Sequence, residues 1–322
     1  MSGGVLVVVD APGGEPDRLS LEALTLARGL GGSLEAVAFG RAPDKLAAFG
    51  VSTTYVVGDE RLSSPLPEPR AVAIVQLVKQ VSPSAVVAAG SERGNELLAH
   101  VAARLGQPMA ANVVSASPDG GRLRLVRQRW AGSLLEDALL DGSPKLLTVA
   151  PHAVAAEPAE KASATAVTAF EPALNEHAFH VRVRPVEAAA TSGISLSDAR
   201  VVVGGGRGVG STEAFSELED LAGLLGAAVG GSRVVTSAGW RPHSDQIGQT
   251  GLRIAPDLYI ACGISGAIQH IVGCKAAKRI LAINTDPDAP IMDVADFAVI
   301  GDLHAVVPAI AAELRRRGVA AS

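Results

Sequence analysis

The chain has 322 residues, 48% of them apolar, and a formal net charge of −5 at pH 7. This length is too great for one compact core and suits two domains. Phosphate binding needs concentrated positive charge, and the longest basic run is only Arg315-Arg316-Arg317, so the composition argues against a nucleic-acid partner.

Hydropathy and cysteine usage limit the cellular compartment and the kind of site that the sequence predicts. No apolar run approaches the roughly 20 residues that span a bilayer, and Val5 to Val9 is too short for a signal-peptide core and lacks a cationic lead-in. We therefore expect a cytoplasmic protein that is not integral to a membrane. Cys262 and Cys274 lack the spacing of a metal or redox pair, and we expect two small core residues. Any redox chemistry by this chain would then need a bound cofactor.

From Val5 to Leu105, short β-branched runs alternate with amphipathic helical patterns. Ser20 suits the N-cap of the first helix, and Gly31 suits its end. The alternation predicts a parallel sheet covered on both faces. Strands are predicted at 5–9, 34–39, 53–57 and 85–89, and helices at 21–30, 44–49, 70–81 and 92–105.

The segment Gly90-Ser91-Glu92-Arg93-Gly94 stands where a strand hands over to a helix, which is the ligand end of such a sheet. Neither a phosphate-loop Lys-Ser nor a fuller glycine fingerprint is present. We therefore interpret this segment as a structural turn and not as a nucleotide site.

Beyond Met109 the pattern changes to antiparallel strands. Asp119-Gly120-Gly121 predicts a hairpin turn between strands at 113–117 and 123–129. Arg127, Arg129 and Trp130 then form a cationic and aromatic cluster, for which a partner-facing or ligand-edge role and a plain solvated strand are both open.

The middle of the chain carries the predicted domain boundary. Residues 151–178 are rich in Ala, Glu, Pro and Thr without a helical apolar face, which indicates a surface excursion. Residues 179–183 are predicted to return as a strand. Residues 187–198 suit a domain junction, so we expect domains at 1–190 and 191–322.

The second domain opens with a predicted buried strand, Arg200 to Gly204, that enters a run of glycines before a helix capped by Ser211 or Thr212 and ending at Leu225. Glycines let a backbone approach a ligand, and a helix N-terminus offers amides to phosphate. These glycines are too contiguous for the dinucleotide fingerprint, so a ligand-binding interpretation depends on the motifs nearer the C-terminus.

Further strands are predicted at 258–261, 280–283 and 297–300, and Arg233 is predicted to begin another short strand. Gly263 and Gly266 bracket a tight turn, and Ser265 suits the N-cap of the helix that carries Gln269 and His270. Polar residues at strand ends suit ribose hydroxyls and adenine edges. Those residues are Asn284, Asp286 and Asp302, of which the two acids could instead cap the Pro287 turn and the last helix.

Several motifs in the C-terminal third occur in one order, and together they are far more specific than one glycine-rich loop. They closely resemble the flavin-binding domain of the electron transfer flavoprotein alpha subunit, and a weaker resemblance covers residues 5–150. The motifs are Val201-Val-Val-Gly-Gly-Gly-Arg-Gly208, Gly231-Ser-Arg233, Ala238-Gly-Trp240, Gly248-Gln-Thr-Gly251, Ala255-Pro-Asp-Leu-Tyr259, Ser265-Gly-Ala-Ile-Gln-His270 and Gly301-Asp-Leu303.

The resemblance implies an α/β fold with two domains. The N-terminal domain is expected to be adenine-nucleotide hydrolase-like, or Rossmann-like, with a mixed sheet that packs against a partner subunit. The C-terminal domain is expected to be a doubly wound parallel-sheet domain that binds FAD. The implied FAD contacts are Gly206, Arg207, Ser232, Arg233, Gln249, Thr250, Gly263, Ser265, Gly266, Ala267, Ile268, Gln269, His270, Asn284, Asp286, Asp302 and Leu303.

Three of these residues carry the implied redox tuning. In the family, Arg233 would lie over the isoalloxazine ring, where a permanent cation stabilises negative charge. The Thr250 hydroxyl would bond flavin N5, since it can donate or accept. His270 would donate to the flavin C2 carbonyl.

The resemblance further implies an electron carrier in a heterodimer and not a substrate-transforming enzyme. The beta subunit would carry AMP or a second FAD, acyl-CoA-type dehydrogenases would supply electrons, and a quinone oxidoreductase would accept them. Two alternatives remain open from the residues: a flavin-dependent oxidoreductase with its own small substrate, and a nucleotide-binding sensor module. A junction poor in large apolar residues also predicts that residues 195–317 rotate as a body against residues 1–185.

Overall fold

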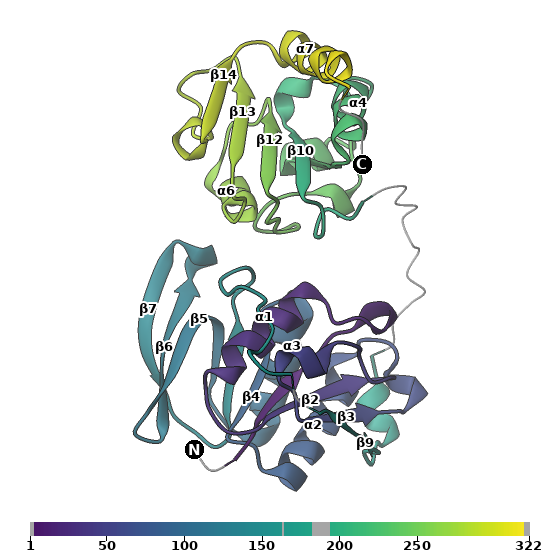
Figure 1. Cartoon of the computed structure of the whole chain (residues 1–322), viewed down its shortest axis with the longest axis vertical. Coiled ribbons are helices and arrows are strands. Elements are labelled where there is room, and N and C mark those ends of the chain that lie inside the picture. The colour runs from purple at the N-terminus through teal and green to yellow at the C-terminus, as the bar shows by residue number, and fades with distance from the viewer. Residues whose placement is uncertain (1–2, 163, 182–193, 319–322) are drawn as a thin grey trace. The chain divides into compact units, whose positions relative to one another are not determined.

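A computed structural model describes residues 3–162, 164–181 and 194–318 of the chain. The chain divides into an N-terminal unit, Met1–Val186, and a C-terminal unit, Glu187–Ser322 (Figure 1). Most of the predicted junction, residues 187–198, lies outside the described residues, so the boundary and the rotation stay predictions. Within the part of the chain that the structure describes, no helix is long and apolar enough to cross a membrane.

The N-terminal unit contains a sheet of nine strands. All neighbours pair in parallel except β5 with β6 and β6 with β7, which confirms the expected mixed sheet. The strands are β1 (Val5–Val8), β2 (Leu34–Phe39), β3 (Thr53–Val57), β4 (Ala85–Ala89), β5 (Met109–Asp119), β6 (Arg122–Arg129), β7 (Leu134–Leu140), β8 (Lys145–Val149) and β9 (Ala166–Phe170), in the spatial order β7-β6-β5-β8-β4-β1-β2-β3-β9.

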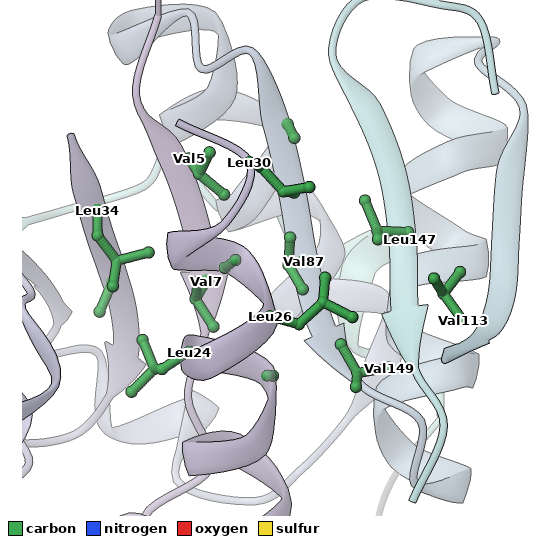
Figure 2. Packing of buried hydrophobic residues seen from close by; sticks show 14 of the residues in the cluster. Val5, Val7, Leu24, Leu26, Leu30, Leu34, Val87, Val113, Leu147 and Val149 are labelled. Carbon is green, nitrogen blue, oxygen red and sulfur yellow. The ribbon is translucent and has the colours of Figure 1, made fainter. Parts of the chain in front are cut away.

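Helices cover both faces of this sheet, so its central strands are continuous apolar runs. Helix α1 (Arg18–Arg28) lies on one face, and Figure 2 shows Leu24 and Leu26 of this helix packed over valines of β1 and β4. Helices α2 (Pro67–Val81) and α3 (Glu92–Leu105) contribute to the core on the other face. The two apolar clusters fix the sheet between the helices.

Several predicted helix details in this unit are wrong; among them, α1 ends at Arg28 with Gly29 at its C-cap, and not at Gly31. Helix α1 is capped by Asp17 and not by Ser20, whose hydroxyl oxygen instead accepts a bond from the Asp10 amide. The helix predicted at 44–49 is a 3-10 turn, Leu46–Phe49, because the backbone on both sides of it has positive φ, 64° at Lys45 and 86° at Gly50.

The predicted hairpin is present. Gly120 and Gly121 have φ values of 55° and 90°, which permits the tight two-residue loop that pairs Asp119 with Arg122. The prediction of a surface excursion at 151–178 is only partly correct, because β9, within this range, forms an edge strand parallel to β3. An edge strand with exposed side chains needs no apolar pattern. The strand predicted at 179–183 is absent from its described part, where a 3-10 turn, Glu176–Phe179, occurs instead.

The C-terminal unit contains a fully parallel five-stranded sheet, which confirms the expected fold class. Its strands are β10 (Val201–Gly205), β11 (Ala228–Gly231), β12 (Leu258–Cys262), β13 (Ile280–Asn284) and β14 (Phe297–Ile300), in the order β11-β10-β12-β13-β14. The chain winds first outward to β11 and then back across β10 to β12. The junction between β10 and β12 is therefore the topological switch point, where such sheets bind ligands.

Among the described residues of this unit, four α-helices accompany the sheet: α4 (Phe215–Leu225), α5 (Arg233–Ser237), α6 (Ile268–Cys274) and α7 (Leu303–Arg316). Helix α4 begins at Phe215, so Ser211 and Thr212 precede its N-cap and do not form it. Cys262 and Cys274 are free and buried, and they belong to apolar clusters on opposite faces of the sheet. Burial raises the pKa of each thiol to about 12, as expected of two core residues.

Candidate functional site

Two glycine-rich loops interlock at the switch point. The Gly206 amide donates to the Cys262 carbonyl at 2.8 Å, and the Gly208 amide donates to the Gly263 carbonyl at 3.1 Å. A Cβ atom on Gly206 would lie 2.2 Å from the Gly263 oxygen, so only glycine permits this approach. The floor of the site, formed by Gly206, Gly208 and Gly263, is therefore backbone packed against backbone.

Most of the other candidate residues follow strands at the same edge of the sheet. The parallel registers pair Gly205 with both Gly231 and Cys262, and pair Asn284 with Ile300. Residues just beyond these strand ends consequently lie along one edge. They include Gly206, Arg207, Ser232, Arg233, Gly263 and Asp302.

Arg207 and Arg233 supply exposed positive charge at this edge. Arg207 lies in the short turn after β10, Arg207–Val209. Arg233 does not begin a strand as predicted. It is the first residue of α5, with Ser232 at the N-cap, because the strand has already ended at Gly231. The two permanent cations suit a ligand that carries negative charge.

The polar loop that carries Gln249 and Thr250 is tied to two elements of the site. The Gln249 amide donates to the Gln269 carbonyl of α6 at 2.8 Å, and the Ile247 amide donates to the Gly231 carbonyl of β11 at 2.9 Å. Gly273 lets α6 approach closely, since a Cβ there would lie 2.4 Å from the Gly248 nitrogen. Thr250 is thereby held beside α6 while its side chain stays exposed.

Thr250 is bonded to a buried glutamine. Gln246 is 2% exposed, and its Nε2 atom donates to the Thr250 hydroxyl oxygen at 3.0 Å. The Gln246 Oε1 atom lies 2.9 Å from the Thr236 hydroxyl, which is also 3.1 Å from the Arg233 carbonyl oxygen. This polar chain joins α5 to the Thr250 loop.

His270 is a buried residue of α6, 7% exposed. Its Nε2 atom lies 2.8 Å from the Tyr259 hydroxyl, and its buried Nδ1 atom has no hydrogen-bond partner among the described residues. Burial lowers the pKa of His270 to about 4. The imidazole is therefore neutral at pH 7.

Several predicted site residues hold turns. Asn284 donates from Nδ2 to the Ile264 carbonyl at 2.9 Å and accepts from the Asp286 amide at 3.1 Å. The Asp286 carboxylate accepts from the Asp288 amide, and Asp302 caps α7 through the His304 amide, as the structural alternatives predict. Both carboxylates are exposed and have further acceptor capacity.

The turn between β12 and α6 differs from the prediction in one respect. Gly263 and Gly266 have φ values of 61° and 81°, as a tight turn requires. Ser265, however, does not cap α6; Ala267 occupies the N-cap, and the Ser265 carbonyl instead accepts from the Ile291 amide. Ser265, Ala267, Ile268 and Gln269 are exposed beside the switch point, whereas Leu303 is buried against Gly263.

Sequence reasoning missed the residues that support the exposed ones. Gln246, Thr236 and Tyr259 each bond a polar group near the site, yet none stands at a strand end or in a tight turn. Tyr259 and His270 are separated by eleven residues and meet only because α6 folds back over β12. No local pattern could have predicted that contact.

Comparisons with known proteins cover both units. Residues 195–275 match the model of the electron transfer flavoprotein FAD-binding domain, and residues 5–175 match that of the electron transfer flavoprotein domain. The electron transfer flavoprotein subunit alpha of Mycobacterium leprae is 38% identical over 97% of this chain and 98% of its own length. That of Bacillus subtilis is 31% identical over 98% of each chain. The probable mitochondrial alpha subunit of Caenorhabditis elegans is 37% identical over 92% of this chain and 89% of its own.

Proposed function

Because the chain belongs to the electron transfer flavoprotein alpha-subunit family, we propose that the switch point of its C-terminal unit holds the FAD of this electron carrier and that the side chains around it tune the flavin. The observation that carries the assignment is the interlocked glycine floor, since it lies at the switch point, the position where parallel sheets bind nucleotides.

Three features of the described residues support the fit of FAD. Gly208 in the glycine floor is exposed and has no side chain that would hold a ligand away from the backbone. Arg207 and Arg233 are exposed cations, which suits a diphosphate and a flavin that gains negative charge. The orphaned Nδ1 atom of His270 is a polar group that a flavin carbonyl would satisfy.

When bound, FAD supplies the capacity to take up and release electrons. The chain supplies the surroundings. We assign Arg233 to the stabilisation of negative charge and the Thr250 hydroxyl to a hydrogen bond with a ring nitrogen. Asn284 and Asp302 are assigned to the adenosine end, where their strand-end positions place amide and carboxylate oxygens.

We propose a carrier role without transformation of an organic substrate. A flavin enzyme with its own substrate needs an acid or base near the reacting atoms. Of the candidate residues, His270 is the natural base, but its Nε2 atom is occupied by Tyr259 and its ring is buried. The free cysteines are typical of a reducing compartment, which supports a cytoplasmic location.

The antiparallel ribbon formed by β5, β6 and β7 is our proposed contact with a beta subunit. Exposed apolar patches mark interaction sites, and this ribbon exposes Trp130 by 80% and Leu135 by 69%. Arg127 and Arg129 both pair with the one carboxylate of Glu136 across the strands. We further propose acyl-CoA-type dehydrogenases as donors and a quinone oxidoreductase as acceptor, on the family resemblance.

Cofactor analysis of the complex co-purified with the beta subunit tests the assignment. Denaturation should release FAD, and Gly206→Val should remove the share bound to this chain because its side chain would collide with the Gly263 backbone and force the two loops apart. The matched control is Gly223→Val, which faces open space on α4. Release of FMN alone, or full FAD content in Gly206→Val, would contradict the proposal.

A further inference from the structure

Thr250 is exposed, but the direction of its hydroxyl is set from inside the fold. A threonine hydroxyl has one proton and two lone pairs, so it can donate or accept. The partner that the described residues give it is Gln246, whose Nε2 atom donates to the Thr250 oxygen at 3.0 Å. That bond uses one lone pair and leaves the hydroxyl proton free to point outward.

The orientation of Gln246 is held at its other end. Its side chain is almost fully buried, and Oε1 accepts from the Thr236 hydroxyl at 2.9 Å. Loop packing adds to this restraint, because a Cβ on Gly251 would lie 2.2 Å from the Gln246 carbonyl oxygen. The amide thus lies between two threonines, accepting from one and donating to the other.

We propose that Gln246 is a positioning residue that presents Thr250 as a hydrogen-bond donor to an unprotonated ring nitrogen of the oxidised flavin. The inference rests on the proposed function, in which Thr250 contacts the flavin. An oxygen that accepts one hydrogen bond becomes a better donor of its own proton, so the buried amide also strengthens the outward bond. Gln246 acts through Thr250 and does not touch the cofactor.

A double-mutant cycle tests this on the complex with the beta subunit. The variants are Gln246→Met, Thr250→Val and the pair, and the readouts are the dissociation constant for oxidised FAD and the flavin midpoint potential. Each single variant should weaken binding of oxidised FAD by about 2- to 10-fold, the equivalent of one net hydrogen bond. The double variant should be no weaker than Thr250→Val alone, since Gln246 then has no hydroxyl to orient.

Two further variants sharpen the result. Gln76→Met is the matched control, because this amide bonds the Ala173 backbone in the N-terminal unit and should leave FAD binding unchanged. Gln246→Glu tests the direction, since an ionised carboxylate accepts from Thr250 and should weaken binding as Gln246→Met does. Binding retained in Gln246→Glu but lost in Gln246→Met would show that Thr250 donates inward, which would overturn the proposal.

Additive losses in the cycle would also overturn it, because a merely structural glutamine weakens binding whether or not Thr250 has a hydroxyl. Circular dichroism and urea midpoints verify that each variant is folded. Failure of the proposed function is distinguishable, since it would appear as a wild-type alpha subunit that binds no FAD.

Discussion

Acid should destabilise the C-terminal unit because His270 must stay neutral in the folded state. Its pKa is lowered by burial from 6.5 to about 4. Between these values the unfolded chain binds a proton that the folded chain excludes, so the stabilisation is fully present above pH 6.5 and is lost as the pH falls towards 4. Each pKa unit corresponds to about 1.36 kcal/mol, so the loss is about 3 kcal/mol.

This loss is measurable because it is a large part of a typical free energy of unfolding, about 5–15 kcal/mol. The chain has two tryptophans, and Trp240 packs against the core of the C-terminal unit. In a Trp130→Phe background, Trp240 fluorescence therefore reports unfolding of that unit in urea. Tyr259 and the two thiols have raised pKa values and do not titrate in this window.

The comparison variant is His270→Gln, which is neutral at every pH. It should be less stable at pH 7 through loss of the Tyr259 contact. Its free energy of unfolding should not show the additional decrease of about 3 kcal/mol that protonation of His270 causes between pH 6.5 and 4. Acid titration of all other groups is common to both proteins and cancels in the difference. Parallel stability curves for the two proteins across this range would refute the reasoning.

Three further predictions concern the floor, the rim and the partner surface. Gly206→Ala should lower the free energy of unfolding by about 1–3 kcal/mol, since its Cβ meets rigid backbone. Gly223→Ala, in open space on α4, should raise the free energy of unfolding by about 0.5–1 kcal/mol. Equal urea midpoints for the two variants would contradict the prediction. Arg233→Ala should change the free energy of unfolding by less than about 0.5 kcal/mol because the residue is exposed. It should weaken FAD binding roughly 10-fold or more in fluorescence titrations. Unchanged affinity would show that Arg233 does not contact the FAD. Leu135→Lys should leave the fold intact and reduce co-purification of the beta subunit, and undiminished recovery would exclude the ribbon as the contact.

Much of the fold is predictable because its signals are local. Helix α3 has the predicted bounds, since Ser91 caps it through the Gly94 amide and Gly106 ends it with a φ of 62°. The edge strand β9 is not predictable, because its partner is distant in sequence and four of its five side chains are exposed.

The candidate site likewise contains some residues that the sequence predicts and others that it does not. Glycines and polar residues at strand ends are visible in sequence, since buried apolar runs stop there. The supporting contacts are not, because the bonds from Gln246 to Thr250 and from Tyr259 to His270 depend on how a loop and α6 fold over the sheet. The strand predicted at Arg233 is wrong because the apolar residues after it fit a short helix equally well.

The glycine floor has a consequence for protein engineering. Because Gly206 and Gly208 contact Gly263 through backbone atoms alone, no side chain at the floor can be exchanged to retune the flavin. Redesign is confined to the rim, where an exposed side chain such as Arg233 can be varied without disturbing the scaffold beneath. Libraries that randomise the rim and keep the three glycines fixed should therefore yield folded carriers with a graded series of midpoint potentials.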